Sequence, residues 1–148
     1  KFLVKDSSFM KDVVKTYRIV QGYIARESGN SVRVRIRDSQ GFLTIKGPSF
    51  NGGLSRFEWE KEIGVDEARH LVGLCGKVIE KERHLVRAGE LCFEVDVFHG
   101  LNEGLVTAEI ELPEENTAFP IPNWLGEEVT GIKKYYNSSL SERPYCSW

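Results

Sequence analysis

The chain has 148 residues, of which 41% are hydrophobic and 28% charged, and its formal net charge is −2. This length fits one domain with a real core, and the composition is that of an ordinary soluble globular protein. The 20 basic residues are balanced by 22 acidic ones, which excludes the strongly basic field of a general nucleic-acid-binding protein. No apolar run approaches the roughly 20 residues of a membrane span.

The three cysteines show no spacing typical of a metal site or a redox motif. They are Cys75, Cys92 and Cys146, and we interpret them as free thiols in a reducing cytoplasm. No signal peptide is visible, and the first residue is Lys1 rather than methionine, so the numbering can begin inside a longer natural chain. We expect a cytoplasmic monomer or homodimer with no nucleic-acid or membrane partner.

The first third of the chain predicts three strands and a short helix. Residues 1–4 are strand-like, residues 6–8 can cap a short helix through Phe9, Val13 and Val14, and residues 17–25 form the second strand. In residues 31–38 arginine alternates with valine or isoleucine, which places Arg33, Arg35 and Arg37 on one face of a third strand. Three like charges on one face repel one another unless an anion lies between them.

The rest of the chain predicts further strands and two more helical regions. Strands are expected at 42–46, 56–62, 77–86, 91–98 and 106–112, with a long loop at 47–55. Asp66 is expected to cap a helix that runs through Leu74 and ends at Gly76. A helical turn is expected at residues 124–125, and another helix near Thr130. Seven or eight strands with tight turns indicate an antiparallel barrel or curved sheet with a few helices outside.

Charged side chains are sorted by sign along these strands. The basic positions are Arg33, Arg35, Arg37, Lys46, Lys81 and Arg83, and the acidic ones are Glu58, Glu60, Glu94, Asp96, Glu109 and Glu111. Such faces can be the solvated side of a half-buried sheet, which is the common arrangement. They can also line a charged lumen, which we favour because solvated faces usually mix in serine, threonine and glutamine.

A lumen lined by both basic and acidic side chains is suited to binding a phosphate compound together with a metal ion. Arginine and lysine donate to phosphate oxygens, and carboxylates two residues apart on a strand offer the oxygen ligands that Mg²⁺ or Mn²⁺ prefers. A glycosidase carboxylate pair is the alternative for Glu58 and Glu60 or for Glu109 and Glu111, but it would not need so much positive charge. The histidines at 70, 84 and 99 match no ligand spacing and are expected to be surface or structural. Trp59 and Trp124 are expected in the core.

In their order along the chain, these segments resemble the CYTH domain family, the triphosphate tunnel metalloenzymes, and in particular a short bacterial member. The matching pieces are residues 1–4 (KFLV), 33–35, 43–47 (LTIKG), 56–60 (RFEWE), 81–83 (KER), 94–98 (EVDVF), 108–112 (AEIEL), 124–130 (WLGEEVT), 136–137 and 140. The family signature Glu-x-Glu-x-Lys is represented only by its lysine, Lys1. The two glutamates either were lost or precede residue 1, and we favour the second.

The resemblance implies an eight-stranded antiparallel closed β-barrel, a tunnel, formed by residues 1–148 as one mainly β (α+β) domain with a few helices packed outside. The residues implied for triphosphate binding are Lys1, Arg33, Arg35, Lys46, Arg56, Lys81 and Arg83. Glu109 and Glu111 would hold Mg²⁺ or Mn²⁺, and Glu58, Glu60 and Asp96 would be further ligands or position the attacking water. Tyr23 either lies near the tunnel or is an ordinary barrel-end aromatic residue.

The implied activity is metal-dependent hydrolysis of a linear triphosphate, with inorganic tripolyphosphate as the first hypothesis. The second hypothesis is class IV-type cyclisation of ATP to cyclic AMP and pyrophosphate, which needs an adenine pocket that the sequence does not identify. The third is a polyphosphate- or nucleotide-binding module without catalytic activity, which applies if the two glutamates are truly absent.

Overall fold

The computed structural model describes residues 1–50, 55–114 and 116–148, without the side chains at 49, 50, 55 and 56. Its strands are β1 (Phe2–Val4), β2 (Val13–Glu27), β3 (Asn30–Arg37), β4 (Gln40–Phe50), β5 (Ser55–Ile63), β6 (Ile79–Ala88), β7 (Leu91–His99), β8 (Val106–Ile110) and β9 (Leu125–Glu128). The helical elements are η1 (Ser7–Asp12), α1 (Val65–Gly73), η3 (Gly100–Asn102), η4 (Lys133–Tyr135), α2 (Asn137–Leu140) and η5 (Tyr145–Ser147). None of these described helices has the length and apolar character needed to cross a bilayer.

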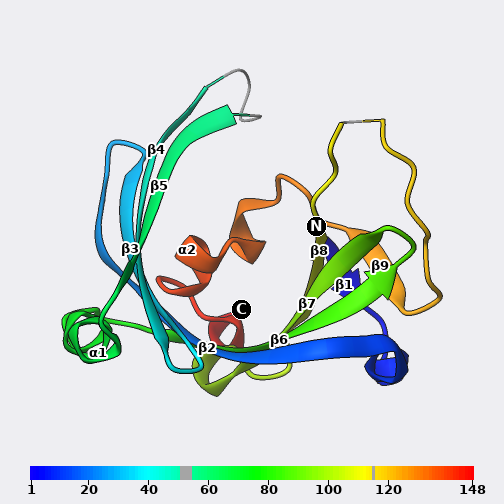
Figure 1. The fold of residues 1–148 in the computed structure, drawn as a ribbon, viewed down its shortest axis with the longest axis horizontal. Coiled ribbons are helices and arrows are strands. Elements are labelled where there is room, and N and C mark those ends of the chain that lie inside the picture. The colour runs from blue at the N-terminus through cyan, green and yellow to red at the C-terminus, as the bar shows by residue number, and fades with distance from the viewer. Residues whose placement is uncertain (51–54, 115) are drawn as a thin grey trace. The chain divides into compact units, whose positions relative to one another are not determined.

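The strands form one sheet in the order β5-β4-β3-β2-β6-β7-β8-β1-β9 (Figure 1). The predicted class, mainly antiparallel β with few helices, is confirmed, although the described residues contain nine strands rather than eight. The predicted closure into a tunnel stays a prediction. The chain divides into two compact units, which we call the arginine unit (Arg18–Glu80) and the terminal unit (Lys1–Tyr17 with Lys81–Trp148).

In the arginine unit, helix α1 covers the face of the sheet opposite the arginines. Val34, which alternates with Arg33 and Arg35, is fully buried. A β-carbon added to Gly41 on β4 would lie 2.6 Å from the β-carbon of Ala68 on α1. This close approach lets α1 lie directly against β3 and β4 (Figure 1). The period-two alternation of residues 31–38 therefore predicted the two faces correctly.

Trp59 is not in the core, contrary to the prediction. It is 42% exposed, and Phe57 on the same face of β5 is 62% exposed. Since β5 is the last strand in the sheet order and α1 packs against β3 and β4, this part of the apolar face receives no cover from the helix. Alternation predicts which face a side chain points to, but not whether another element covers that face.

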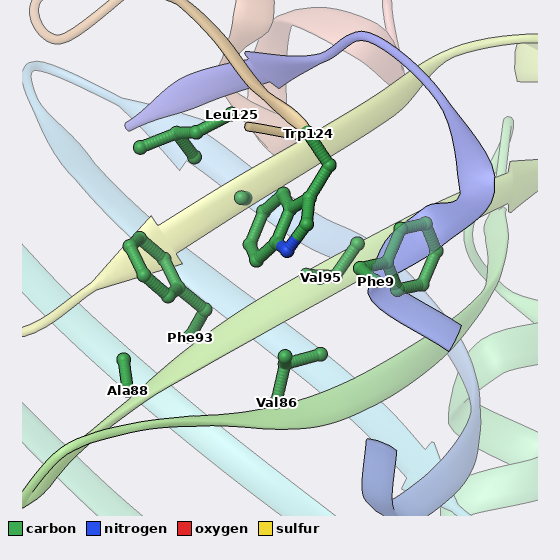
Figure 2. Packing of buried hydrophobic residues seen from close by; sticks show 8 residues of the cluster. Phe9, Val86, Ala88, Phe93, Val95, Trp124 and Leu125 are labelled. Carbon is green, nitrogen blue, oxygen red and sulfur yellow. The ribbon is translucent and has the colours of Figure 1, made fainter. Parts of the chain in front are cut away.

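The terminal unit has its core on one face of β6, β7 and β8. Figure 2 shows Trp124 packed among side chains from several elements, with ring centroids 5.2 Å from Phe93 and 5.9 Å from Phe9. Val95 on β7 and Ala108 on β8 complete this layer and are fully buried. The expectation that Trp124 belongs to the core is confirmed. Because Phe93 and Val95 point into the core, the alternating residues of β7 point to the other face.

Several predicted helix boundaries were wrong. Helix α1 begins at Val65 after Gly64, whose N–H donates to the Glu67 carboxylate (2.9 Å), so Asp66 lies in the first turn and is not the cap. Val13 and Val14 begin β2 rather than ending the first helix. The helix expected near Thr130 is two short pieces, η4 and α2.

The helical turn predicted at residues 124–125 is also incorrect. Leu125 begins β9, which pairs with β1 through Val4↔Leu125 and Phe2↔Glu128. The edge of β1, more than 100 residues away in the sequence, supplies hydrogen-bond partners that no local pattern reveals. Long-range pairing thus decided the conformation of this segment.

Candidate active site

In the arginine unit, three strands carry a row of interacting polar side chains. Arg33, Thr44 and Glu60 are register partners on β3, β4 and β5. The Thr44 hydroxyl donates to Glu60 Oε2 (2.6 Å), and Arg33 Nη2 donates to Thr44 Oγ1 (3.1 Å) and to Glu60 Oε2 (3.3 Å). Arg35 Nη2 donates to both oxygens of Glu60 at 3.2 Å. One carboxylate therefore holds two guanidinium groups on the same face.

The charge of Glu60 is stabilised by this arrangement. Burial would raise the pKa of Glu60, but the Thr44 hydroxyl and the positive charges of Arg35 and Arg33 outweigh it and lower the pKa. The side chains of Arg33 and Arg35 are 11% and 15% exposed. They are thus largely buried cations whose repulsion is offset by one ionised carboxylate.

The same face carries a second ion pair. Lys46 Nζ lies 2.9 Å from Glu58 Oε2, and the two residues are register partners on β4 and β5. Arg37 donates to Gln40 (3.2 Å) near the turn between β3 and β4. Arg56, also predicted to bind substrate, has its side chain outside the described residues. Tyr23 is the register partner of Arg33 on β2, half-buried beneath Arg26.

In the terminal unit, Asp96 is the centre of a buried ion cluster. Lys81 Nζ donates to Asp96 Oδ2 (2.6 Å), and Arg83 binds the same carboxylate with Nε to Oδ1 and Nη2 to Oδ2, both at 2.7 Å. This fork-shaped contact is the strong bidentate geometry of arginine with a carboxylate. Arg83 Nη1 also donates to Glu94, and Lys81 Nζ reaches Asn137 Oδ1 on α2 (3.4 Å).

The pKa shifts in this cluster follow from burial and pairing. The side chains of Lys81 and Asp96 are each 1% exposed. Burial lowers the pKa of the Lys81 ammonium to about 8, although Asp96 opposes the shift. Burial would raise the pKa of Asp96, but Lys81 and Arg83 hold it well below its ordinary value. Both members of the pair are therefore charged at neutral pH.

Glu109 and Glu94 lie next to this cluster on neighbouring strands. They are register partners on β8 and β7, and Lys1 Nζ donates to Glu109 Oε1 (2.5 Å). Burial would raise the pKa of Glu109, but Lys1 lowers it. Burial raises the pKa of Glu94, neighbouring carboxylates raise it further, and Arg83 offsets only part of the shift. Negative charge is thus concentrated where β7 meets β8.

The carboxylates of this cluster are oxygen donors of the kind that bind a divalent metal ion. Across the part of the chain that the structure describes, no three carboxylate, histidine or cysteine side chains form a ready-made metal site. Mg²⁺, however, commonly binds one or two carboxylates and takes its other ligands from water and substrate phosphates. Glu109 and its partner Glu94 offer such a pair of hard oxygen donors, and a cation would relieve their mutual repulsion.

The structure places the predicted site residues in two clusters. The first holds Arg33, Arg35, Lys46, Glu58 and Glu60, and the second holds Lys1, Lys81, Arg83, Asp96 and Glu109. Glu111, a predicted metal ligand, is exposed just beyond the end of β8. Thr44, Glu94 and Asn137 contact these residues but were not assigned to the site. Alternation with Lys46 and Asp96 could have indicated the first two. Asn137 lay in a segment that matches the family (136–137), but strand alternation gives it no role.

Each cluster consists of basic side chains oriented by carboxylates, an arrangement suited to binding a polyanion. A family model of the CYTH domain matches residues 1–145, so this chain belongs to the CYTH domain family. The predicted resemblance is thereby confirmed.

Relatives and a solved structure agree with this assignment. An inorganic triphosphatase of Acetivibrio thermocellus is 48% identical over 147 residues, covering 98% of this chain and 92% of that protein. An inorganic triphosphatase of Nitrosomonas europaea is 35% identical, covering 95% and 93% respectively. The crystal structure of the inorganic triphosphatase NE1496 is similar with a TM-score of 0.71 at 31% identity, covering 95% of this chain and 93% of that one.

Proposed function

We propose that this chain hydrolyses a linear triphosphate in a metal-dependent reaction, with inorganic tripolyphosphate as the preferred substrate. The observation that carries the proposal is the pair of guanidinium groups of Arg33 and Arg35, held on one face by Glu60. Two fork-shaped donors side by side match the closely spaced oxygens of a phosphate chain. The two relatives named inorganic triphosphatase support this choice of substrate.

Binding is assigned to the basic residues of both clusters. They are Lys1, Arg33, Arg35, Lys46, Lys81 and Arg83. Arg56 is added on the family resemblance, because its side chain lies outside the described residues. These groups neutralise the phosphate chain, which removes much of the electrostatic barrier to attack by water. Glu60 and Asp96, whose oxygens are engaged by cations, orient the basic groups in this scheme.

We assign the orientation of the attacking water to Glu58, whose Oε2 also pairs with Lys46 (2.9 Å). Its side chain is 43% exposed, more than that of Glu60 (33%) or Asp96 (1%). The water oxygen forms a bond to a terminal phosphorus, the phosphoanhydride bond on the opposite side breaks, and Glu58 accepts the proton from the water. The products are orthophosphate and pyrophosphate.

Glu109, with Glu94 and Glu111 close by, would hold Mg²⁺ or Mn²⁺. When bound, such an ion supplies charge neutralisation and Lewis-acid activation of the phosphate oxygens. We also place the protein in the cytoplasm, since Cys75, Cys92 and Cys146 are all free thiols. We propose a monomer or homodimer.

Release of orthophosphate from tripolyphosphate tests this proposal. We expect release with Mg²⁺ or Mn²⁺, none with excess EDTA, and a loss of about 100-fold or more when Arg33 and Arg35 are both replaced by glutamine. Arg69→Gln is the matched control, because Arg69 is an exposed arginine on α1 in the same unit, and its activity should be unchanged.

The competing functions give different products. Formation of cyclic AMP and pyrophosphate from ATP, with no orthophosphate from tripolyphosphate, would contradict the proposal in favour of the cyclase. Tight binding of tripolyphosphate without turnover at any metal concentration would favour a binding module. Either result rejects the hydrolase assignment.

A further inference from the structure

Thr44 occupies the middle of the row of register partners formed with Arg33 and Glu60. It is fully buried, and its hydroxyl makes two side-chain hydrogen bonds at once. The hydroxyl donates to Glu60 Oε2 (2.6 Å) and accepts from Arg33 Nη2 (3.1 Å). A hydroxyl has one hydrogen to donate and lone pairs to accept, so both bonds are compatible.

The bond from Thr44 to Glu60 Oε2 (2.6 Å) is shorter than the contacts of either arginine with this carboxylate. The contacts of Arg33 and Arg35 with the same carboxylate are 3.2 to 3.3 Å long. A glutamate side chain has considerable rotamer freedom, and its ordering must be favoured by specific contacts. The buried hydroxyl therefore fixes the oxygen against which both guanidinium groups are oriented.

We propose that Thr44 is a positioning residue, whose hydroxyl holds the Glu60 carboxylate between Arg33 and Arg35 and so orients both guanidinium groups toward a phosphate chain. This inference rests on the proposed function. Thr44 touches neither water nor substrate in this role and acts only through Glu60 and Arg33. Replacement of the hydroxyl should therefore weaken binding of the phosphate chain more than it alters the chemical step.

A merely structural role makes the opposite prediction for two conservative variants. Thr44→Val keeps the volume and β-branching of a buried strand residue but loses the hydroxyl. Thr44→Ser keeps the hydroxyl but loses a buried methyl group. If Thr44 only fills space, the valine variant resembles the wild type and the serine variant is impaired. If Thr44 positions Glu60, the order is reversed.

The experiment compares both variants with the wild type by three measurements. These are KM and kcat for tripolyphosphate, Kd for tripolyphosphate by calorimetry in EDTA, and Tm. Since a hydrogen bond to a charged group is a strong one, Thr44→Val should raise KM and Kd about tenfold with a smaller change in kcat. Thr44→Ser should stay within about twofold of the wild-type Kd even if its Tm is lower.

Two controls sharpen the interpretation. Thr107 is equally buried, and its Oγ1 is without a hydrogen-bond partner among the described residues, so Thr107→Val makes the same chemical change without breaking a bond. It should leave Kd unchanged. In a Glu60→Gln background, adding Thr44→Val should produce much less than its tenfold effect, because the carboxylate that Thr44 orients is gone.

The proposal is overturned if Thr44→Val binds tripolyphosphate as tightly as the wild type, or if Thr44→Ser loses as much affinity as Thr44→Val. A loss of tripolyphosphate affinity in Thr107→Val equal to that in Thr44→Val also counts against the proposal. Binding in EDTA separates this inference from the hydrolase assignment. A wild-type protein that binds tripolyphosphate in EDTA but releases no orthophosphate when Mg²⁺ or Mn²⁺ is supplied rejects the hydrolase, while the affinities of the two variants still test Thr44. A wild type that neither binds in EDTA nor releases orthophosphate with metal rejects both. A wild type that hydrolyses with metal but does not bind in EDTA leaves the KM values of the two variants to test Thr44.

Discussion

Replacement of Asp96 by asparagine is expected to lower the free energy of unfolding by about 3 to 5 kcal/mol, measured by urea denaturation. Asp96 is the buried counter-ion of both Lys81 and Arg83, with contacts of 2.6 and 2.7 Å. Asparagine has nearly the same shape but no charge, so the two buried cations lose their shared counter-ion, and Arg83 keeps its ion pair with the partly exposed Glu94. Release of orthophosphate from tripolyphosphate should also fall, because Lys81 and Arg83 lose the carboxylate that fixes their orientation.

A double-mutant cycle with Lys81→Met checks the cause. If the cost comes from leaving the buried ammonium unpaired, Asp96→Asn should cost at least about 1 kcal/mol less in the Lys81→Met background. Purely additive effects of the two substitutions would contradict the coupling that the 2.6 Å contact implies.

Asp96→Asn should also change how the free energy of unfolding depends on pH in the acidic range. The pKa of Asp96 is lowered in the folded protein below its ordinary value of 3.8. The stabilisation from its ionised form is therefore present above that value and is lost as the pH falls below it. Asp96→Asn removes this contribution, so the variant should lose less stability than the wild type on acidification from pH 4. An equally steep loss in both proteins would argue against the role assigned to Asp96.

Replacement of Glu109 by glutamine is expected to reduce turnover by about 100-fold or more, beyond the roughly 10- to 100-fold loss typical of residues that only support a metal ligand. Glutamine keeps an oxygen that can accept from Lys1 Nζ, which lies 2.5 Å from Glu109 Oε1, but it loses the negative charge that a divalent cation needs. The measurement is orthophosphate release across a series of Mg²⁺ or Mn²⁺ concentrations, in which the variant should require more metal.

Two variants distinguish a metal role of Glu109 from a role in holding Lys1. Lys1→Met should raise KM for tripolyphosphate without changing the concentration of metal required. Glu82→Gln is the matched control, since Glu82 is a partly exposed carboxylate on β6 that alternates with Lys81 and Arg83 and so lies on the opposite face. If Glu109→Gln showed the wild-type metal dependence, the assignment of Glu109 as a ligand would be wrong.

The arginine strand shows what could be predicted from the sequence. Covalent geometry alone places side chains two residues apart on the same face of a strand. Arg33 and Arg35 therefore had to share a face, with Val34 on the other, and the structure has this arrangement with Val34 fully buried. The same rule placed Asp96 opposite Phe93 and Val95. The class of fold and the candidate binding residues followed from such alternation together with the resemblance to the family.

Other features depended on segments far apart in the sequence. Trp59 and Trp124 were both expected in the core, yet only Trp124 of the two is buried, because Phe9 and Phe93 pack against it. Residues 125–128 became a strand because β1 offered an edge for pairing.

The sequence by itself determined which charges share a face, since that depends only on the local period of the backbone. Only the tertiary structure decided which carboxylate orients which cation. Arg33 and Glu60 are 27 residues apart in the chain, and Lys81 and Asp96 are 15 apart. Such pairs meet through strand register and burial. Burial would raise the pKa of Asp96, but the two cations that the fold brings to it, Lys81 and Arg83, lower that pKa, and strand register places the Thr44 hydroxyl against Glu60.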